Sequence, residues 1–464
     1  LISILKGSDK MELSFKQAII PVITMAFLII MSVSFWNVPI QIALFFEIII
    51  ITCLSLFWGY NWSRIEEMMF SSFKNIGNVI IILFLIGMMI GLWIAIGTVP
   101  TMISYGLKTI NPEYFLVLSF ISTSLVSMAI GTAVGTASTI GLALISIAET
   151  LGISLPLAAG AIISGAYVGD RMSPVSSIAN ITAHSAEADI LDMVKSMMKT
   201  TIMPYITAGL IYLIIGLNLG EVGEVTGGFN ELITALDGYF MISIWMLLPP
   251  ILIITLAFLK TPTILNLAVN IIFSLGLGIT ITERSWSGLL NVMFKGFEET
   301  SGIIFIDNIL ARGGLTSMLE LISLIIFAVI LGGLLEQLGV LNSILKPIVH
   351  HITGKIKLGL ITIFSSILSA ILGCNQFLAV FLPARMLIPH YDRIQVKRKE
   401  LARALGDSGL VFSPLIPWNV NALMMTAVLG VDTFSYAPFA FFILLMPFSN
   451  ILVTIIKYKK QATT

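Results

Sequence analysis

Long, almost uninterrupted apolar runs constrain this chain more than any other feature. The runs at positions 19–35, 40–58 and 79–96 each approach the ~20 residues that an α-helix needs to cross a bilayer. Only 11% of the residues are charged and 57% are hydrophobic, whereas soluble chains carry roughly 25% charged residues. So few charges cannot cover a water-facing surface. We therefore predict an all-α polytopic membrane protein, because the ~10-residue strands of a barrel would not need such runs.

Charge and cysteine usage exclude several classes of function. The net charge is zero, so no basic field exists to attract nucleic acid. Cys53 and Cys374 both lie in apolar segments with no CxxC pair, and the four histidines lack metal-ligand spacing. No nucleophile–base pair lies among the polar residues of the apolar segments. We expect no nucleic-acid partner, no cofactor and no enzymatic centre; the lipid bilayer is the expected partner, and a homodimer stays open.

The second half of the chain repeats the first in outline, because patterns of the first half recur there in the same order. The spacings between them differ only by loop-sized insertions. The paired patterns are Trp62-Ser63 with Trp286-Ser287, Gly91-Leu92 with Gly333-Leu334, Ser124 with Ser366, and Asp170 with Asp407. We predict an internal duplication, with a cytoplasmic segment at 1–18, one transmembrane repeat at 19–218, an acidic linker at 219–238 and a second transmembrane repeat at 239–464.

Basic residues in short loops predict the orientation of these repeats. Lysines before position 17, the Lys397-Arg398-Lys399 cluster and the lysines at 457–460 place both termini and the 393–403 loop inside. The first repeat then begins inside and the second begins outside. Two inverted-topology repeats are the architecture of many secondary transporters, whose binding site lies between the repeats near the membrane midplane.

Two polar stretches interrupt the apolar pattern and carry the candidate site. One runs from Gly169 to Asn180 (GDRMSPVSSIAN) and the other from Gly406 to Asn419 (GDSGLVFSPLIPWN). Each has Gly-Asp, then Ser-Pro, then Asn. A carboxylate at the bilayer centre costs ~2.5–3.5 kcal/mol on insertion scales, and a helix break exposes carbonyls that only a protein-lined or wet cavity tolerates. Such features are typical of a functional site.

The chemistry of these stretches suits a small hard cation. Carboxylate, hydroxyl, amide and carbonyl oxygens are ligands that Na⁺ accepts, and a partly desolvated carboxylate can hold a proton in its place. One site that binds either ion is sufficient for antiport. The predicted ion- and proton-binding residues are Asp170, Ser173, Asn180, Asp407, Ser413 and Asn419, with the two aspartates as the Na⁺ ligands.

Some of these assignments leave alternatives open. Arg171 stands beside Asp170 and could neutralise it, whereas Asp407 is followed by Ser408 and has no adjacent base. Asp407 is therefore the preferred ion and proton carrier. Asn180 and Asn419 can be ligands or caps of broken helices.

Two candidate hairpin tips complete the site. The tract 131–139 is small and rich in hydroxyls, including Thr132, Thr136 and Ser138. It can mediate helix packing or form the tip of a re-entrant hairpin that lines a cavity. The following run, 142–151, is too short to span and favours the hairpin. Asn375 and Gln376 occupy the same place in the second half, where two amides in an apolar run need partners.

These motifs resemble the NhaC family of bacterial Na⁺/H⁺ antiporters. The family patterns look like Gly-Asp-Lys-Met-Ser-Pro and Glu-Asp-Ser-Gly-Thr-Val-x-Ser-Pro-Leu-Ile-Pro-Trp-Asn, which match Gly169 onward and Gly406 onward. The blocks Gly97-Thr98-Val99-Pro100, Tyr105-Gly106-Leu107 and 159–167 are also similar. The resemblance implies inverted repeats with re-entrant hairpins in the bacterial cytoplasmic membrane. The implied activity is exchange of cytoplasmic Na⁺ for H⁺.

Departures from the family patterns leave a second function open. Arg171 replaces the family lysine, and four oxygen-bearing family positions hold Ser177, Ile178, Ala179 and Leu410 instead. Gly406 replaces the family glutamate. Fewer oxygen donors leave room for a small organic substrate. The alternative is therefore an H⁺- or Na⁺-coupled antiporter of an organic anion, such as malate or lactate, or of an amino acid.

Overall fold

The computed structural model describes residues 13–109, 111–219, 238–259, 261–297, 313–350 and 352–462. All regular elements in these ranges are helices. Ten of the helices are long and apolar enough to cross a membrane, or eleven if one bent pair counts as a span. The predicted all-α polytopic membrane protein is therefore confirmed. Most of the predicted N-terminal segment and of the acidic linker lies outside the described residues.

The first half contains two peripheral helices, a helical hairpin and a broken helix. Its elements are α1 (Phe15–Ile30), η1 (Met31–Trp36), α2 (Ile40–Phe57), α3 (Trp62–Phe73), η2 (Lys74–Ile76), α4 (Gly77–Ala95), α5 (Thr98–Thr109), α6 (Pro112–Ile130), α7 (Ala133–Thr136), η3 (Ala137–Gly141), α8 (Leu142–Thr150), α9 (Leu155–Met172), α10 (Ser177–Ser185) and α11 (Ile190–Asn218).

The second half is also built of helices, again with a broken stretch before its last long helix. They are η4 (Ile244–Leu247), α13 (Leu248–Phe258), α14 (Thr263–Thr280), α15 (Trp286–Lys295), η5 (Thr316–Met318), α17 (Leu319–Gln337), α18 (Val340–His350), α19 (Lys355–Gly373), α20 (Gln376–Arg393), α21 (Arg398–Leu405), η6 (Gly406–Leu410), η7 (Ser413–Leu415), α22 (Val420–Leu429), α23 (Thr433–Tyr436), η8 (Ala437–Phe439) and α24 (Phe441–Ala462).

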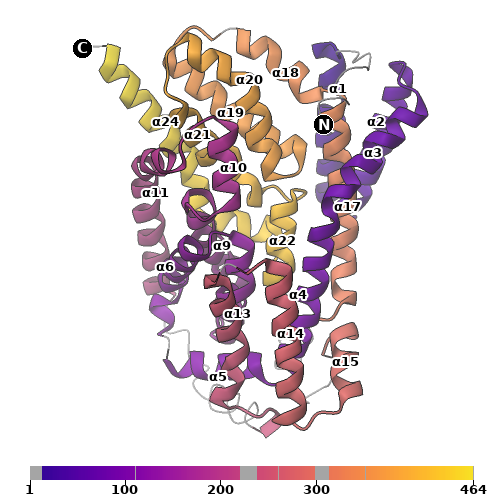
Figure 1. The fold of residues 1–464 in the computed structure, drawn as a ribbon, viewed down its shortest axis with the longest axis vertical. Coiled ribbons are helices and arrows are strands. Elements are labelled where there is room, and N and C mark those ends of the chain that lie inside the picture. Colours follow the sequence, from indigo (N-terminus) through magenta and orange to yellow (C-terminus); the bar gives the residue numbers. More distant parts are fainter. Residues whose placement is uncertain are drawn as a thin grey trace.

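The two halves pack reciprocally. Helix α4 packs on α14 and α15 of the second half, and its counterpart α17 packs on α2 and α3 of the first. Figure 1 shows α5 and α15 at one end of the long axis and α18 at the other, with α1–α2 and α13–α14 at opposite ends. This is the arrangement that an inverted duplication would produce, and the duplication itself stays a prediction.

Both hairpins turn by the same local geometry. Helix α6 ends at Gly131 (φ 78°) and α19 ends at Cys374 (φ 56°), so a left-handed residue reverses the chain in each half. The next residue caps the following helix. The Thr132 hydroxyl accepts from Gly135 N, and the Asn375 side chain accepts from Leu378 N. The polar tip residues therefore begin helices.

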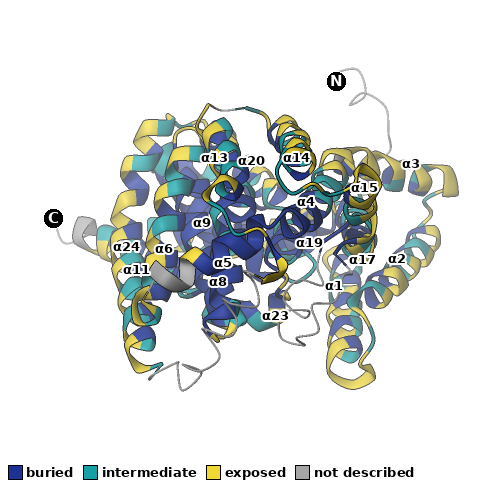
Figure 2. Ribbon diagram, turned by 90° about the horizontal axis from the view of Figure 1, so that it is seen from below, coloured by how far each residue is buried: buried dark blue, intermediate teal, exposed yellow. Residues whose placement is uncertain are grey.

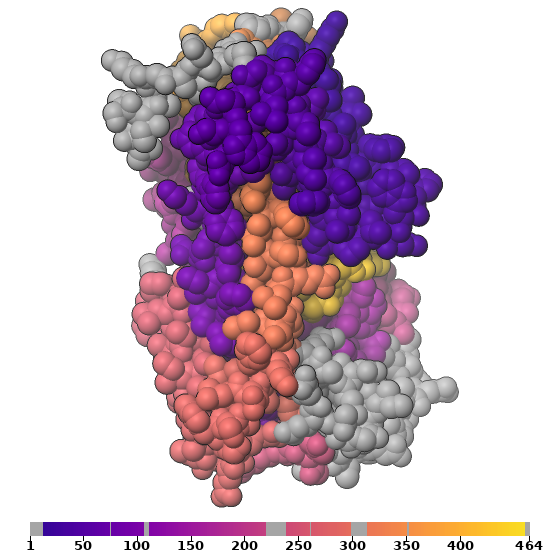
Figure 3. All heavy atoms as spheres, turned by 90° about the vertical axis from the view of Figure 1, so that its right-hand side faces the viewer, coloured from indigo at the N-terminus to yellow at the C-terminus, as the bar shows by residue number. Residues whose placement is uncertain are grey.

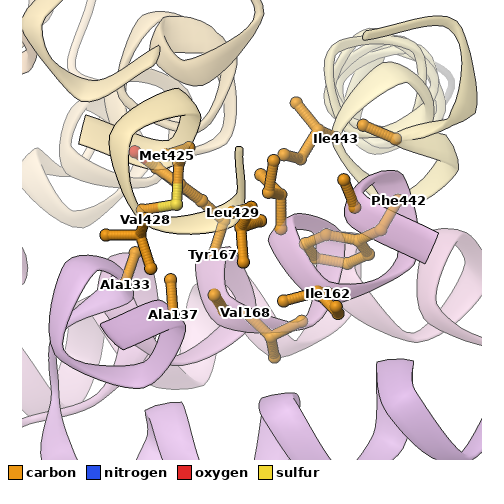
Figure 4. Packing of buried hydrophobic residues seen from close by; sticks show 14 of the residues in the cluster. Ala133, Ala137, Ile162, Tyr167, Val168, Met425, Val428, Leu429, Phe442 and Ile443 are labelled. Atoms are coloured by element: carbon orange, nitrogen blue, oxygen red, sulfur yellow. The ribbon is translucent and has the colours of Figure 1, made fainter. Parts of the chain in front are cut away.

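The most buried elements lie at the centre of the molecule. Figure 2 shows α8 and α9 almost entirely buried, whereas α1, α2, α11 and α24 expose one face outward. Figure 4 shows the apolar contact between the halves, where Ala133, Ala137 and Tyr167 face Met425, Val428 and Leu429. This close-packed apolar interface fixes the position of the two helix breaks relative to each other.

Two predicted span boundaries are wrong. The tract from Ala133 is itself helical and continues to Thr150, so the helix is 18 residues long. The run at 142–151 therefore gives no support for a re-entrant hairpin, because it continues a helix that begins in the small polar residues before it. The apolar run at 241–259 also predicts a full span, whereas its apolar helix covers only Ile244–Phe258.

The approach of α9 to α6 gives a test of this packing. A Cβ added at Gly169 would lie 2.1 Å from the Ser127 carbonyl carbon and 2.2 Å from Met128 N. Because both neighbours are backbone atoms, we expect Gly169→Ala to destabilise the fold by at least ~1–3 kcal/mol. Thermal unfolding of the detergent-purified protein, followed by tryptophan fluorescence, measures the loss.

Gly77→Ala is the matched control, because nothing lies within 4 Å of a Cβ at that position. We expect it to be neutral or stabilising by up to ~1 kcal/mol, as for Gly→Ala in a helix. Equal melting temperatures for the two variants would contradict the close packing of α6 and α9.

Candidate functional site

The first break separates α9 from α10 and satisfies its own backbone. Pro174 disfavours a helical conformation at Ser173, which is extended (ψ 130°). The Ser176 hydroxyl donates to the Asp170 carbonyl at 2.5 Å. The Asn180 amide donates to the carbonyls of Pro174 and Ser176, both at 2.8 Å. Thus the amide nitrogen of Asn180 bonds to the broken backbone, and the side chain is exposed.

The second break is built by a wide turn. Residues Gly406–Leu410 form a π-helical turn after α21, and the Ser413 hydroxyl donates to the Leu410 carbonyl at 2.7 Å. The Asn419 side chain accepts from Asn421 N at 3.1 Å and donates to the Ala370 carbonyl at 3.0 Å. Asn419 therefore caps α22 and ties it to α19.

A buried ion pair joins the two breaks. The Arg171 guanidinium contacts the Asp407 carboxylate, and both side chains are fully buried. Thr200 donates to the second Asp407 oxygen at 2.5 Å, and Thr201 accepts from Arg171. The Arg171 guanidinium also lies 5.5 Å from the centre of the Phe442 ring. The expectation that Arg171 neutralises Asp170 and leaves Asp407 without a base is therefore wrong.

Asp170 lies where the two hairpin tips meet. The carboxylate is 5% exposed and accepts from Ala133 N at 3.1 Å, which is the first residue of α7. The Gln376 side chain, at the start of α20, also lies beside it. No described Lys, Arg or His forms an ion pair with Asp170. Asp407 thus has a buried cationic partner, whereas the described partners of Asp170 are uncharged.

Other buried oxygen atoms lie near Asp170. The Gln376 Oε1 atom is buried with no partner among the described residues. The hydroxyl of Tyr167, one turn before Asp170 on α9, is also buried, and the Ser413 side chain of the second break lies beside it. A cluster of oxygen acceptors short of donors is a suitable environment for a cation or a proton, since either supplies the missing positive charge.

Two separate cavities border the two breaks. Cavity one, of about 770 Å³, reaches the second break at Pro417 and is bordered by the starts of α2 and α17. Cavity two, of about 310 Å³, reaches the first break at Val175 and Ser177 and is bordered by the turn between α13 and α14. An inverted duplication, which stays a prediction, would place the turns α1–α2 and α13–α14 at corresponding positions, and the two cavities with them.

The remaining predicted residues have local roles. Thr136 and Ser138 donate to carbonyls one turn back on their own helix, and Ser173 donates to the Met128 carbonyl. Thr132 and Ser138 also line cavity two. The structure thus brings Asp170, Gln376 and the hairpin tips together, and Asp407 with Arg171. Asn419 is the N-cap of α22, whereas Asn180 lies inside α10, whose N-cap is Ser176.

Sequence reasoning missed three residues that hold the site together. The apolar run that predicts a span here begins only at Ile202, whereas α11 begins at Ile190 and so contains Thr200 and Thr201. Arg403 falls in the predicted cytoplasmic loop, but it is 2% exposed within α21 and donates to Asn450 at 2.9 Å. The adjacent pair of threonines and a base one turn before Asp407 are the signals that could have revealed them.

Two broken helices that meet around a buried ion pair, with a cavity at each break, define a membrane transporter of the broken-helix class. Comparison with known proteins agrees. Residues 165–457 match the model of the Na⁺/H⁺ antiporter family. The chain belongs to this family.

Curated relatives span several substrates. The chain is 33% identical to the Na⁺/H⁺ antiporter NhaC of Bacillus subtilis, over 96% of this chain and 99% of that one. It is 34% identical to the malate-2H⁺/Na⁺-lactate antiporter of the same organism, over 87% and 86% of the two chains. It is 29% identical to the arginine/ornithine antiporter ArcD of Halobacterium salinarum, over 96% and 92%.

The buried ion pair gives a stability prediction. Arg171→Gln leaves the Asp407 carboxylate buried without its cation, and we expect a loss of ~3–5 kcal/mol. The double variant Arg171→Met/Asp407→Leu removes both charges, so it should be markedly more stable than the single variant. Thermal unfolding in detergent compares the two with the parent protein. A single variant as stable as the parent would rule out the pairing.

Proposed function

We propose that the protein is a Na⁺/H⁺ antiporter that exchanges cytoplasmic Na⁺ for H⁺ at a buried aspartate site between its two halves. The observation that carries this proposal is Asp170, a buried carboxylate at the meeting point of both hairpin tips with no cationic partner among the described residues. Membership of the antiporter family supports Na⁺ and H⁺ as the exchanged ions, and the burial and partners of Asp170 support it as their binding site.

Asp170 is a better carrier than Asp407. A group that exchanges H⁺ for Na⁺ must be able to take either cation in the same place. Arg171 already occupies the Asp407 carboxylate, so a second cation there would have to displace a buried guanidinium. At Asp170 the Gln376 Oε1 atom faces no described donor and can serve as a ligand. Asp407 then acts as the counter-charge that holds Arg171 and α9.

The two cavities support alternate access to this site. Each reaches one break, and each is bordered by the corresponding turn of one half. Movement of one half against the other would open one route while closing the other. Thr132 and Ser138 line cavity two beside the Asp170 hairpin and would pass the ion by their hydroxyl oxygens.

The same proposal fixes the setting of the protein. It works in the bacterial cytoplasmic membrane with both termini in the cytoplasm, as the basic loops predict. Ion gradients drive it, so it needs no cofactor and catalyses no chemical reaction. Asn180, Ser413 and Asn419 act in this scheme by shaping the breaks.

Cavity one gives an indication about the second candidate function. At about 770 Å³ it is large enough for a small organic molecule. Glu320 and Asp432 line it, and no basic residue does so among the described lining residues. An organic anion would meet repulsion here. Of the organic substrates, a cationic amino acid therefore fits this cavity better than malate or lactate.

The ion site is tested in everted membrane vesicles from a host without its own antiporters. Na⁺ added to vesicles with a preset pH gradient should collapse that gradient. Asp170→Asn keeps the size and the hydrogen bonds but cannot exchange ions, so we expect the response to vanish. Glu66→Gln, an exposed acid on α3, is the matched control and should respond as the parent does. A Na⁺ response that survives Asp170→Asn would move the site elsewhere, whereas no response of the parent to Na⁺ or Li⁺ at any pH would reject the exchange itself.

The organic alternative is tested by counterflow in proteoliposomes. Vesicles loaded with unlabelled malate, lactate or arginine are diluted into the same labelled compound. We expect no counterflow of malate or lactate above protein-free liposomes, because the described lining of cavity one is acidic. Clear malate or lactate counterflow would overturn this assignment, and arginine counterflow would favour the cationic organic substrate over Na⁺.

A further inference from the structure

A second buried carboxyl lies outside the site described above. Glu47 is on α2, and its side chain is fully buried. The buried residues of α2 recur along one face of the helix, and Glu47 stands in the middle of that face, between Leu44 and Ile51. This face packs on α1 and α17. Figure 3 shows α17 in orange between the indigo α1–α2 pair and the violet α3–α4 segment.

The hydrogen bonds around Glu47 leave one of its two carboxyl oxygens without a described donor. Thr24 of α1 lies 2.9 Å from Glu47 Oε1, and Oε2 has no partner among the described residues. The Thr24 hydroxyl is also within 3.1 Å of the Ile20 carbonyl. A hydroxyl has one proton to donate. If Thr24 donates it to the Ile20 carbonyl, the bond to Glu47 requires a proton on the carboxyl.

No opposite charge compensates Glu47 within the described part of the chain. The elements packed against α2 are α1, η1, α3 and α17. Their titratable residues lie toward helix ends: Lys16 in the first turn of α1, Glu320 and Glu336 at the two ends of α17, and Arg64, Glu66 and Glu67 on α3, with none on η1. No described residue forms an ion pair with Glu47. A bare carboxylate here would lack both water and a cation.

The second half shows how the same position is satisfied when it holds an amide. Asn270 is the eighth residue of α14, as Glu47 is of α2, and each helix follows a proline cap. Asn270 is also fully buried, but it accepts from Trp93 at 2.9 Å and donates to the Pro249 carbonyl at 2.7 Å. Its oxygen and its nitrogen are both used. Glu47 differs in that its side chain is titratable and one of its oxygens has no described hydrogen-bond partner.

We propose that Glu47 is a second proton-binding site, separate from the Asp170 site, and that its proton holds the α2–α17 contact closed. The start of α2 and the first turns of α17 also form one wall of cavity one, where Gln41 approaches Glu320 at 3.5 Å. Release of the proton leaves a carboxylate that must gain water, so the helices separate at this wall. Proton binding at Glu47 is independent of the proposed function. The coupling of that proton to cavity one rests on the proposed function.

The protonation state is tested by infrared spectroscopy of the full chain in liposomes. A buried carboxylic acid has a C=O stretching band that a carboxylate lacks. We expect Glu47→Gln to remove one such band, and Thr24→Val to shift that band to higher frequency because its hydrogen bond is lost. Glu66→Gln should leave the band unchanged. A folded Glu47→Gln protein with an unaltered carboxylic-acid spectrum would overturn the proton site.

A chemical probe gives an independent readout. Dicyclohexylcarbodiimide reacts with protonated carboxyls in apolar surroundings, and peptide mapping distinguishes an adduct on Glu47 from one on Asp170. We expect labelling of Glu47 that falls as the pH rises, and none at position 47 in Glu47→Gln. Absence of a Glu47 adduct at every pH, in a protein labelled elsewhere in the membrane, would argue against the site.

The coupling is tested by the pH profile of exchange in the same liposomes. If deprotonation of Glu47 opens this wall, the exchange rate of the parent protein should rise with pH. Glu47→Gln mimics the protonated carboxyl, so we expect this rise to be lost while the affinity for Na⁺ stays the same. An unchanged profile would overturn the coupling. The Asp170→Asn experiment fails or succeeds independently, because infrared and labelling results require no transport.

Discussion

Arg171 and Asp407 carry opposite charges in a place where neither could remain alone. Arg171 belongs to α9 and Asp407 to the turn after α21, so their contact joins the broken helices of the two halves. Thr200 and Thr201 complete the hydrogen bonds from a third helix, α11. Removing one partner from such a pair costs ~3–5 kcal/mol, far more than an exposed pair contributes. The pair also distinguishes the two aspartates, because it engages Asp407 and leaves Asp170, to which we assign the ion in our proposal, without a described cationic partner.

The Ser-Pro motifs build the breaks more than they supply ligands. The hydroxyl of Ser176 and the amide of Asn180 bond to backbone groups of the first break, and Ser413 and Asn419 do so at the second. In an apolar core these bonds are what make an interrupted helix tolerable. The groups around Asp170 come instead from the hairpin tips, through Ala133 N and the Gln376 side chain. The Ser-Pro motifs therefore shape the two helix breaks, and the groups around Asp170 come from the hairpin tips.

The helices, the two breaks and the two aspartates follow from the sequence, because apolar runs and Ser-Pro dipeptides act locally. The partner of Arg171 does not. Adjacent residues of a helix point in different directions, so Arg171 cannot face Asp170 although it follows it directly. Its true partner is far along the chain, and only tertiary packing brings the two together. The helix from Ala133 was missed for a related reason, since packing overrides the weak helix preference of small polar residues. Proximity in sequence was the wrong guide to proximity in space.

Corresponding positions of the two halves hold unlike chemistry. Asp170 has neutral partners whereas Asp407 is paired, and Glu47 keeps one oxygen without a described partner whereas Asn270 is fully bonded. In both comparisons the group able to bind a further proton or cation lies in the first half, and its counterpart is satisfied. In our proposals, both the exchanged ion and the second proton therefore bind in the first half. Under these proposals the second half mainly holds the first in place, and the proton proposed at Glu47 acts on the α2–α17 contact between them.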